Sequence, residues 1–149
     1  MIPLVSDGAA QAWFIAGTIP LIVAGGLHVV LTLVDTARPR YFTPRDSSLR
    51  PALEGTPIRF GGHAAPSMWR AWLGFNISHG LGVFTFGLLC LLIAAHDFAV
   101  VEDIAAIRPL TIAFSAAFLG LSLRYWFYCP ALNTGAATAC FTVATILSA

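Results

Sequence analysis

The sequence predicts an all-α fold, namely an integral membrane four-helix bundle with one long, Arg-rich cytoplasmic loop. Three uncharged stretches indicate it, because no Asp, Glu, Lys or Arg occurs at residues 8–34, 71–96 or 125–149. A fourth uncharged run covers residues 109–123. Composition agrees, since 58% of the 149 residues are hydrophobic and 10% are charged. A charge near the centre of a bilayer costs at least about 2.5 kcal/mol, so such stretches are typical of membrane spans.

Each span is placed from its apolar run and from the residues that begin or interrupt it. We place helices at about 10–34, 67–95, 103–128 and 130–149, with a loop at about 35–66, in a single transmembrane domain of residues 1–149. Pro20 removes one helical donor from the first span, so a kink is expected there, and Gly25 with Gly26 allows close approach of another helix. Ser67 suits the N-cap of the second span, and Pro109 suits the first turns of the third.

Arginines predict the orientation of the spans. The first loop and the start of the second span contain six of the eight basic residues, all of them arginine: Arg38, Arg40, Arg45, Arg50, Arg59 and Arg70. The second loop is acidic, with Asp97, Glu102 and Asp103. The positive-inside rule then predicts that the first and third loops are cytoplasmic and that both termini are non-cytoplasmic. Within the first loop, one short helical segment is expected at 45–54.

Several function classes are excluded by what the chain lacks. A net charge of +1 offers no field for nucleic acid, and the absence of lysine excludes Schiff-base chemistry. Cys90, Cys129 and Cys140 are far apart with no CxxC pair, so neither a disulfide framework nor a zinc site is expected. No HExxH or GxSxG motif occurs. We therefore predict no catalytic residues and no metal site. Whether the chain is an enzyme is left open by the sequence, which favours a non-enzymatic role.

Polar residues inside the predicted spans gather toward the cytoplasmic side. His28 lies near the end of the first span, and Asn76 and His79 lie in the second, with Arg124 and Tyr125 at the end of the third. No carboxylate is expected within a span. In the second span, one stripe contains Trp69, Trp72, Asn76, His79, Val83 and Phe86, and a second stripe of small residues contains Gly74, Ser78 and Gly82.

Three explanations of these polar residues are open. They can bond to one another and to the backbone carbonyls that Pro20 leaves without a donor, and so hold the bundle together. Alternatively, His28 or His79 can bind a cofactor as axial ligand of a haem iron or of a chlorophyll-type pigment. In the third explanation, His79 acts with Arg124 and Tyr125 on a lipid-soluble or anionic substrate. His63 and His96, in or beside loops, are expected to be solvated.

Arginine and tryptophan side chains near the first loop predict contacts with the membrane or with a partner. The candidates are Arg38, Arg40, Arg45, Arg50, Arg59, Trp69 and Trp72. Basic side chains beside a span attract anionic lipids, and tryptophan is enriched at the membrane interface. Bound lipids and other membrane subunits are therefore the expected partners.

Three segments resemble a known family. The segments GGLHVVLTL, MWRAWLGFNISHGLG and LRYWFYCP are similar to an uncharacterised family of small bacterial four-helix membrane proteins, over the first three helices and the start of the fourth. The resemblance implies a multi-pass protein of a bacterial inner membrane. It draws attention to His28, Asn76, His79 and Arg124, but it implies no reaction.

The sequence favours a non-enzymatic accessory subunit of a larger inner-membrane assembly, of respiratory or photosynthetic type. Small size, few residues outside the spans and the small-residue stripe of the second span point to packing as the main role. The alternative is a membrane protein that binds haem or chlorophyll, or an enzyme for a lipid-soluble substrate, through His28, Asn76, His79 and Arg124. A small transporter or channel is a third interpretation, based on the helix breaks at Pro20 and Gly25.

Overall fold

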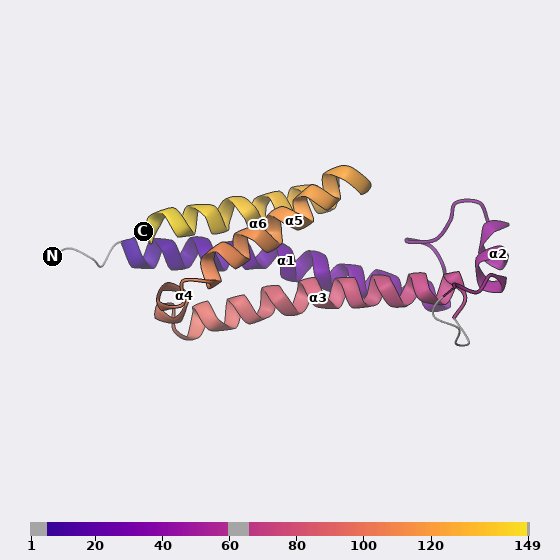
Figure 1. Cartoon of the computed structure of the whole chain (residues 1–149), viewed down its shortest axis with the longest axis horizontal. Coiled ribbons are helices and arrows are strands. Elements are labelled where there is room, and N and C mark those ends of the chain that lie inside the picture. The colour runs from indigo at the N-terminus through magenta and orange to yellow at the C-terminus, as the bar shows by residue number, and fades with distance from the viewer. Residues whose placement is uncertain (1–5, 60–65, 149) are drawn as a thin grey trace. The chain divides into compact units, whose positions relative to one another are not determined.

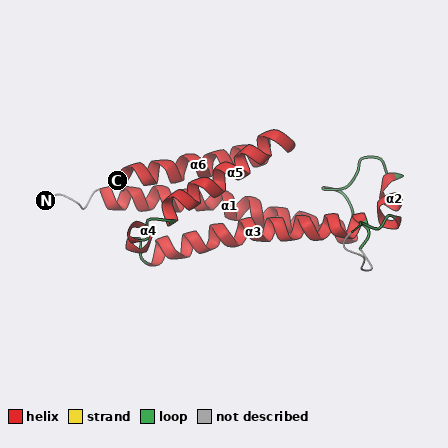
Figure 2. Ribbon diagram, viewed as in Figure 1, coloured by secondary structure: helices red, strands yellow, loops and turns green. Residues whose placement is uncertain are grey.

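The computed structural model describes residues 6–59 and 66–148, and regular structure within them is helical apart from one isolated bridge. The helices are α1 (Ser6–Ala37), α2 (Leu49–Gly55), α3 (Met68–His96), α4 (Ala99–Asp103), α5 (Ile107–Tyr125) and α6 (Tyr128–Leu147). Figures 1 and 2 show them along the chain. The predicted all-α class is confirmed.

Four helices in the described part of the chain are long and apolar enough to cross a membrane: Gly8–Ala37 of α1, and all of α3, α5 and α6. This agrees with the number of spans predicted from the uncharged runs. α1 continues through Pro20 to Ala37, beyond the predicted end at residue 34. α3 begins where the Ser67 hydroxyl accepts the backbone N–H of Arg70 at 3.4 Å, as an N-cap does.

The start of the third span differs from the prediction at residue 103. Asp103 is instead the last residue of α4, because Ile104 is extended with ψ of 92° and ends that helix. α5 then begins at Ile107, which places Pro109 in its first turn as expected. Proline is tolerated there because the N–H that it lacks has no partner in the first turn of a helix.

α6 begins at Tyr128, directly after the extended residues Trp126 and Phe127. The last predicted residue of this span, Ala149, lies outside the described residues. The helix is rich in hydroxyl groups that bond to carbonyls of their own helix, four residues earlier: Thr134 at 2.8 Å, Thr138 at 2.7 Å, Thr142 at 2.8 Å and Thr145 at 2.9 Å. These hydroxyls therefore need no partner outside α6.

The chain divides into two compact units, and the division falls within α1 and α3. Unit 1 contains residues 6–24 and 83–148 of the described chain, and unit 2 contains residues 25–82.

Unit 1 has an aromatic core. The buried Phe14 ring of α1 lies 5.1 Å from Phe141 of α6, and Phe86 of α3 stacks on Phe114 of α5 at 3.9 Å, centroid to centroid. A side-chain carbon added at Gly17 would lie 2.9 Å from the Phe141 ring, so glycine is needed for this approach of α1 and α6. α5 and α6 lie side by side (Figure 1).

Unit 2 packs the second half of α1 against the first half of α3. A side-chain carbon added at the buried Gly80 would lie 3.0 Å from Val29 and 3.1 Å from the carbonyl oxygen of Gly25. The two backbones are therefore close at Gly25, as the sequence predicted. The glycine that allows this contact on α3 is Gly80, which the predicted small-residue stripe does not include.

Candidate functional site

His28 and Asn76 join α1 and α3 inside unit 2. The His28 Nε2 atom lies 3.1 Å from Asn76 Oδ1, and Asn76 is 1% exposed. The Asn76 Nδ2 atom donates to the carbonyl oxygen of Trp72 at 2.8 Å, so the amide oxygen faces His28. Because an amide oxygen only accepts hydrogen bonds, this geometry requires the proton of neutral His28 on Nε2. Each polar atom of the Asn76 amide thus has a partner.

His79 belongs to the same cluster through ring contacts. Its ring lies 5.3 Å from that of His28 and 5.9 Å from that of Phe75, while Phe42 of the loop lies 4.5 Å from His28. The structure therefore brings His28, Asn76 and His79 together, as the first of the three explanations requires. The sequence alone did not predict the Asn76–His28 pair, because this pair depends on which sides of α1 and α3 face each other.

Asp35 is a site residue that the sequence analysis missed. It lies in the last turn of α1 and is fully buried. Its Oδ1 accepts the backbone N–H groups of Arg40 at 2.7 Å and Tyr41 at 2.9 Å, and Oδ2 accepts that of Phe42 at 2.5 Å. The expectation of no carboxylate within a span needs correction, since the candidate span extends to Ala37. With three donors on it, this carboxylate organises the turn after α1.

Arg124 and Tyr125 lie in unit 1, at the end of α5. Both are exposed, and the Arg124 guanidinium lies 5.3 Å from the centre of the Tyr125 ring. The predicted grouping of these two residues with Asn76 and His79 stays a prediction. His96 is exposed at the end of α3, as expected, and His63 lies outside the described residues.

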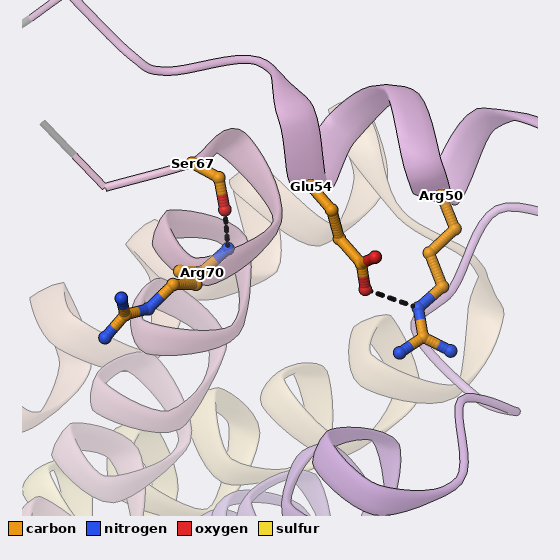
Figure 3. Close-up of polar contacts among 4 residues, drawn as sticks. All are labelled: Arg50, Glu54, Ser67 and Arg70. Carbon is orange, nitrogen blue, oxygen red and sulfur yellow. Dashed lines mark hydrogen bonds and ion pairs between the residues drawn. The ribbon is translucent and has the colours of Figure 1, made fainter.

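Three of the predicted contact residues, Arg50, Trp69 and Trp72, lie at or beside the start of α3 in unit 2. Arg50 of α2 forms an ion pair with Glu54, Nε to Oε1 at 2.9 Å, which Figure 3 shows beside the Ser67 cap of Arg70. The Arg50 guanidinium also lies 5.5 Å from the ring centre of Trp69, which is buried. The Trp72 indole donates to the carbonyl oxygen of Phe42 at 2.8 Å. Trp69 and Trp72 therefore have contacts inside this chain.

The two histidines do not fit a haem held between them. A macrocycle bound by both would separate the ring centres by two metal–nitrogen bonds of about 2 Å each plus both ring radii. That sum exceeds the observed 5.3 Å. In addition, His28 Nε2 is occupied by Asn76. Among the described residues, no three His, Cys, Asp or Glu side chains gather as a metal site. A pigment held by one histidine alone stays a prediction.

No family model matches this chain, and neither a curated protein nor a solved structure does so. The family resemblance stays a prediction, and the geometry of these residues is what bears on function.

Proposed function

We propose that this chain is a multi-pass protein of a bacterial inner membrane and a non-enzymatic accessory subunit of a larger assembly there, of respiratory or photosynthetic type. Membrane insertion is supported by the apolar helix surface that the chain leaves uncovered. In an apolar 18-residue window of each candidate span, between 17% and 28% is buried inside the chain. Leu132 and Leu123 are 73% and 71% exposed. Apolar surface of this extent requires lipid or another protein around it.

The accessory role is supported chiefly by one observation on α3. Gly74, Ser78 and Gly82 follow one another at steps of four, and all three are exposed. Apart from the adjacent residues and the neighbouring backbone of α3 itself, no described atom lies within 4 Å of a side-chain carbon added at Gly74 or Gly82. The Ser78 hydroxyl bonds to the carbonyl of Phe75 at 3.0 Å, so it adds little bulk or polarity outward. Small residues at this spacing let a second membrane helix approach closely.

The polar residues support a packing role in a second way. His28 and Asn76 bond to each other, and Asp35 accepts three backbone N–H groups. Throughout the described chain, no buried side-chain nitrogen or oxygen lacks a hydrogen-bond partner. The hydrogen bonds of His28, Asn76 and Asp35 thus stabilise α1, α3 and the turn after α1. They do not pair a nucleophile with a base, which is the arrangement that covalent catalysis needs.

The test is co-purification from the native membrane in mild detergent, followed by native mass spectrometry. We expect the 15.8 kDa chain to carry further protein subunits. Gly82→Leu blocks the small-residue stripe and should release these subunits. Gly120→Leu makes the same change at an exposed glycine of α5 that also has nothing within 4 Å, and should keep them. A wild-type chain that always runs alone contradicts the proposal, as does equal loss of partners in both variants.

A further inference from the structure

We propose that a cavity in unit 2, at the start of α3, binds one anionic phospholipid of the surrounding bilayer. The cavity has a volume of about 360 Å³. Its main lining residues are Phe42 and Pro44 of the loop, Leu53 of α2, and Met68, Trp69 and Trp72 of α3. This volume lies in the range of about 300–1,000 Å³ in which small-molecule sites fall. The inference rests on the membrane insertion proposed above, but not on any partner subunit.

The walls of the cavity are held in place by hydrogen bonds. Asp35 binds the backbone N–H of Phe42, and the carbonyl of Phe42 accepts the Trp72 indole N–H. At the other wall, the Met68 N–H donates to the Thr56 carbonyl at 2.8 Å, which ties the end of α2 to the start of α3. The indole of Trp72 thus spends its only donor on the wall. Thr43 also lines the cavity, but most of the lining is carbon, which suits an acyl chain better than a polar ligand.

Arg50 supplies a positive group beside this apolar wall. Its guanidinium lies 5.5 Å from the ring centre of Trp69, which lines the cavity. Its Nε is paired with Glu54 (Figure 3). Among the described residues, its two terminal nitrogens make no hydrogen bond. A guanidinium edge of this kind binds a phosphate through two parallel hydrogen bonds. A phosphate-binding group therefore lies beside the apolar wall, next to Trp69, although Arg50 itself does not line the cavity.

Charge and exposure favour a lipid as the occupant. Residues 25–82 contain six arginines and three acidic residues, and one of these, Asp35, is buried by its backbone donors. Met68 and Trp72 are 41% and 40% exposed, so the cavity can be reached from outside. Both residues stand at the first turns of a candidate span, where headgroups and acyl chains meet. An anionic phospholipid carries the phosphate and the apolar chain in one molecule, whereas free phosphate leaves the wall uncovered.

The experiment uses the full chain in nanodiscs of phosphatidylcholine with phosphatidylglycerol at four to one, released for native mass spectrometry. We expect one phosphatidylglycerol to be retained in preference to phosphatidylcholine. Arg50→Gln should lower its occupancy about fivefold. Glu54→Gln should raise it, since Arg50 is then released from its ion pair. Leu53→Trp, which fills the cavity without changing charge, should abolish retention. Circular dichroism verifies that each variant is helical.

Arg124→Gln is the matched control, because it removes the same charge from another arginine that lies over an aromatic ring, 5.3 Å from Tyr125. It should leave the retained lipid unchanged. An equal loss in Arg124→Gln and Arg50→Gln overturns the site in favour of diffuse surface charge. The lipid site is also overturned if Leu53→Trp retains the lipid or if phosphatidylcholine is retained equally. The same holds if millimolar inorganic phosphate displaces the lipid, or if a peptide is found in its place. Loss of partner subunits in the Gly82→Leu test has no bearing on these outcomes.

Discussion

Asn76 makes two hydrogen bonds of different kinds. One, to the carbonyl of Trp72, stays within α3, and the other joins α3 to His28 of α1. Asn133 of α6 makes the first kind of bond, to the carbonyl of Cys129 at 2.9 Å, and within residues 6–59 and 66–148 it makes no bond to another helix. These two asparagines allow the interhelical bond to be measured by comparison of matched substitutions.

Asn76→Ala should lower the free energy of unfolding by about 1–2 kcal/mol, because it removes the interhelical bond and leaves His28 Nε2 with one partner fewer. Asn133→Ala should change it by less than about 0.5 kcal/mol. Reversible unfolding in mixed detergent micelles measures both. Combining Asn76→Ala with His28→Ala should cost less than the sum of the single changes. Equal effects at the two asparagines would falsify the role given to the His28 bond.

Asp46 responds to pH through Ser48. The Ser48 hydroxyl and then its backbone N–H lower the pKa of the Asp46 carboxyl, by donating to Oδ1 at 2.7 and 2.9 Å. A lowered folded-state pKa contributes stability above the unfolded pKa, and this contribution is lost as pH falls through the folded pKa. Ser48→Ala should raise the pKa toward its ordinary value, as measured by carboxyl NMR titration. An unchanged pKa contradicts the hydrogen bond of the Ser48 hydroxyl.

At the scale of elements, α3 uses its glycines on two different sides. Gly80 and Gly87 are buried against α1, each within its own unit, with the closest α1 atoms 3.0 Å from an added side-chain carbon. Gly74 and Gly82 are exposed. On α3, Gly80 and Gly87 therefore serve packing against α1, whereas Gly74 and Gly82 belong to the exposed small-residue stripe.

Gly80→Leu should destabilise the protein by about 1–3 kcal/mol, because the new side chain overlaps Val29 and the backbone of Gly25. Gly82→Leu, two residues further along the same helix, should change the free energy of unfolding by less than about 0.5 kcal/mol. Thermal unfolding in detergent gives the comparison. If Gly82→Leu is the more damaging of the two, the rotation of α3 assigned here is wrong.

The turn after α1 depends on the three backbone N–H groups that Asp35 accepts. Asp35→Ala leaves three backbone N–H groups without their acceptor, so hydrogen exchange of residues 40–42 should accelerate about tenfold. Mass spectrometry of exchanged peptides measures this rate. Asp46→Ala removes an exposed carboxylate that bonds to Ser48 and should leave exchange at 40–42 unchanged. Slow exchange in Asp35→Ala means that other contacts hold the turn.

At the scale of the whole molecule, the arginine distribution predicts the orientation in the membrane. Ser47, in the first loop, and Ala105, between α4 and α5, are both exposed. In a background without Cys90, Cys129 and Cys140, Ser47→Cys should react with a membrane-impermeant maleimide only in inverted vesicles. Ala105→Cys should react only in intact cells. Labelling of both positions from the same side contradicts the predicted orientation.

Much of the fold and part of the candidate site could be predicted from the order of residues. Pro109 and Ser67 lie in the first turn and at the N-cap of their helices, as expected. Asp35 was missed, because its role is to accept backbone N–H groups that lie five to seven residues later in the chain. In the sequence, Asp35 is simply the first charged residue after an apolar run. Most residues in that position belong to an exposed loop, so the position gave no sign that Asp35 is buried.

The distribution of charged residues was enough to predict the all-α class and the number of long apolar helices. A charge is costly in lipid on any side of a helix, so an uncharged run predicts a span whatever the rotation of the helix. The His28–Asn76 pair, the inward Gly80 and the outward Gly82 required the folded structure. Each depends on the rotation of a helix about its own axis, and α3 is nearly equally hydrophobic on all sides, so its sequence alone does not fix that rotation. Contacts between the helices select that rotation, so it appears only when they pack.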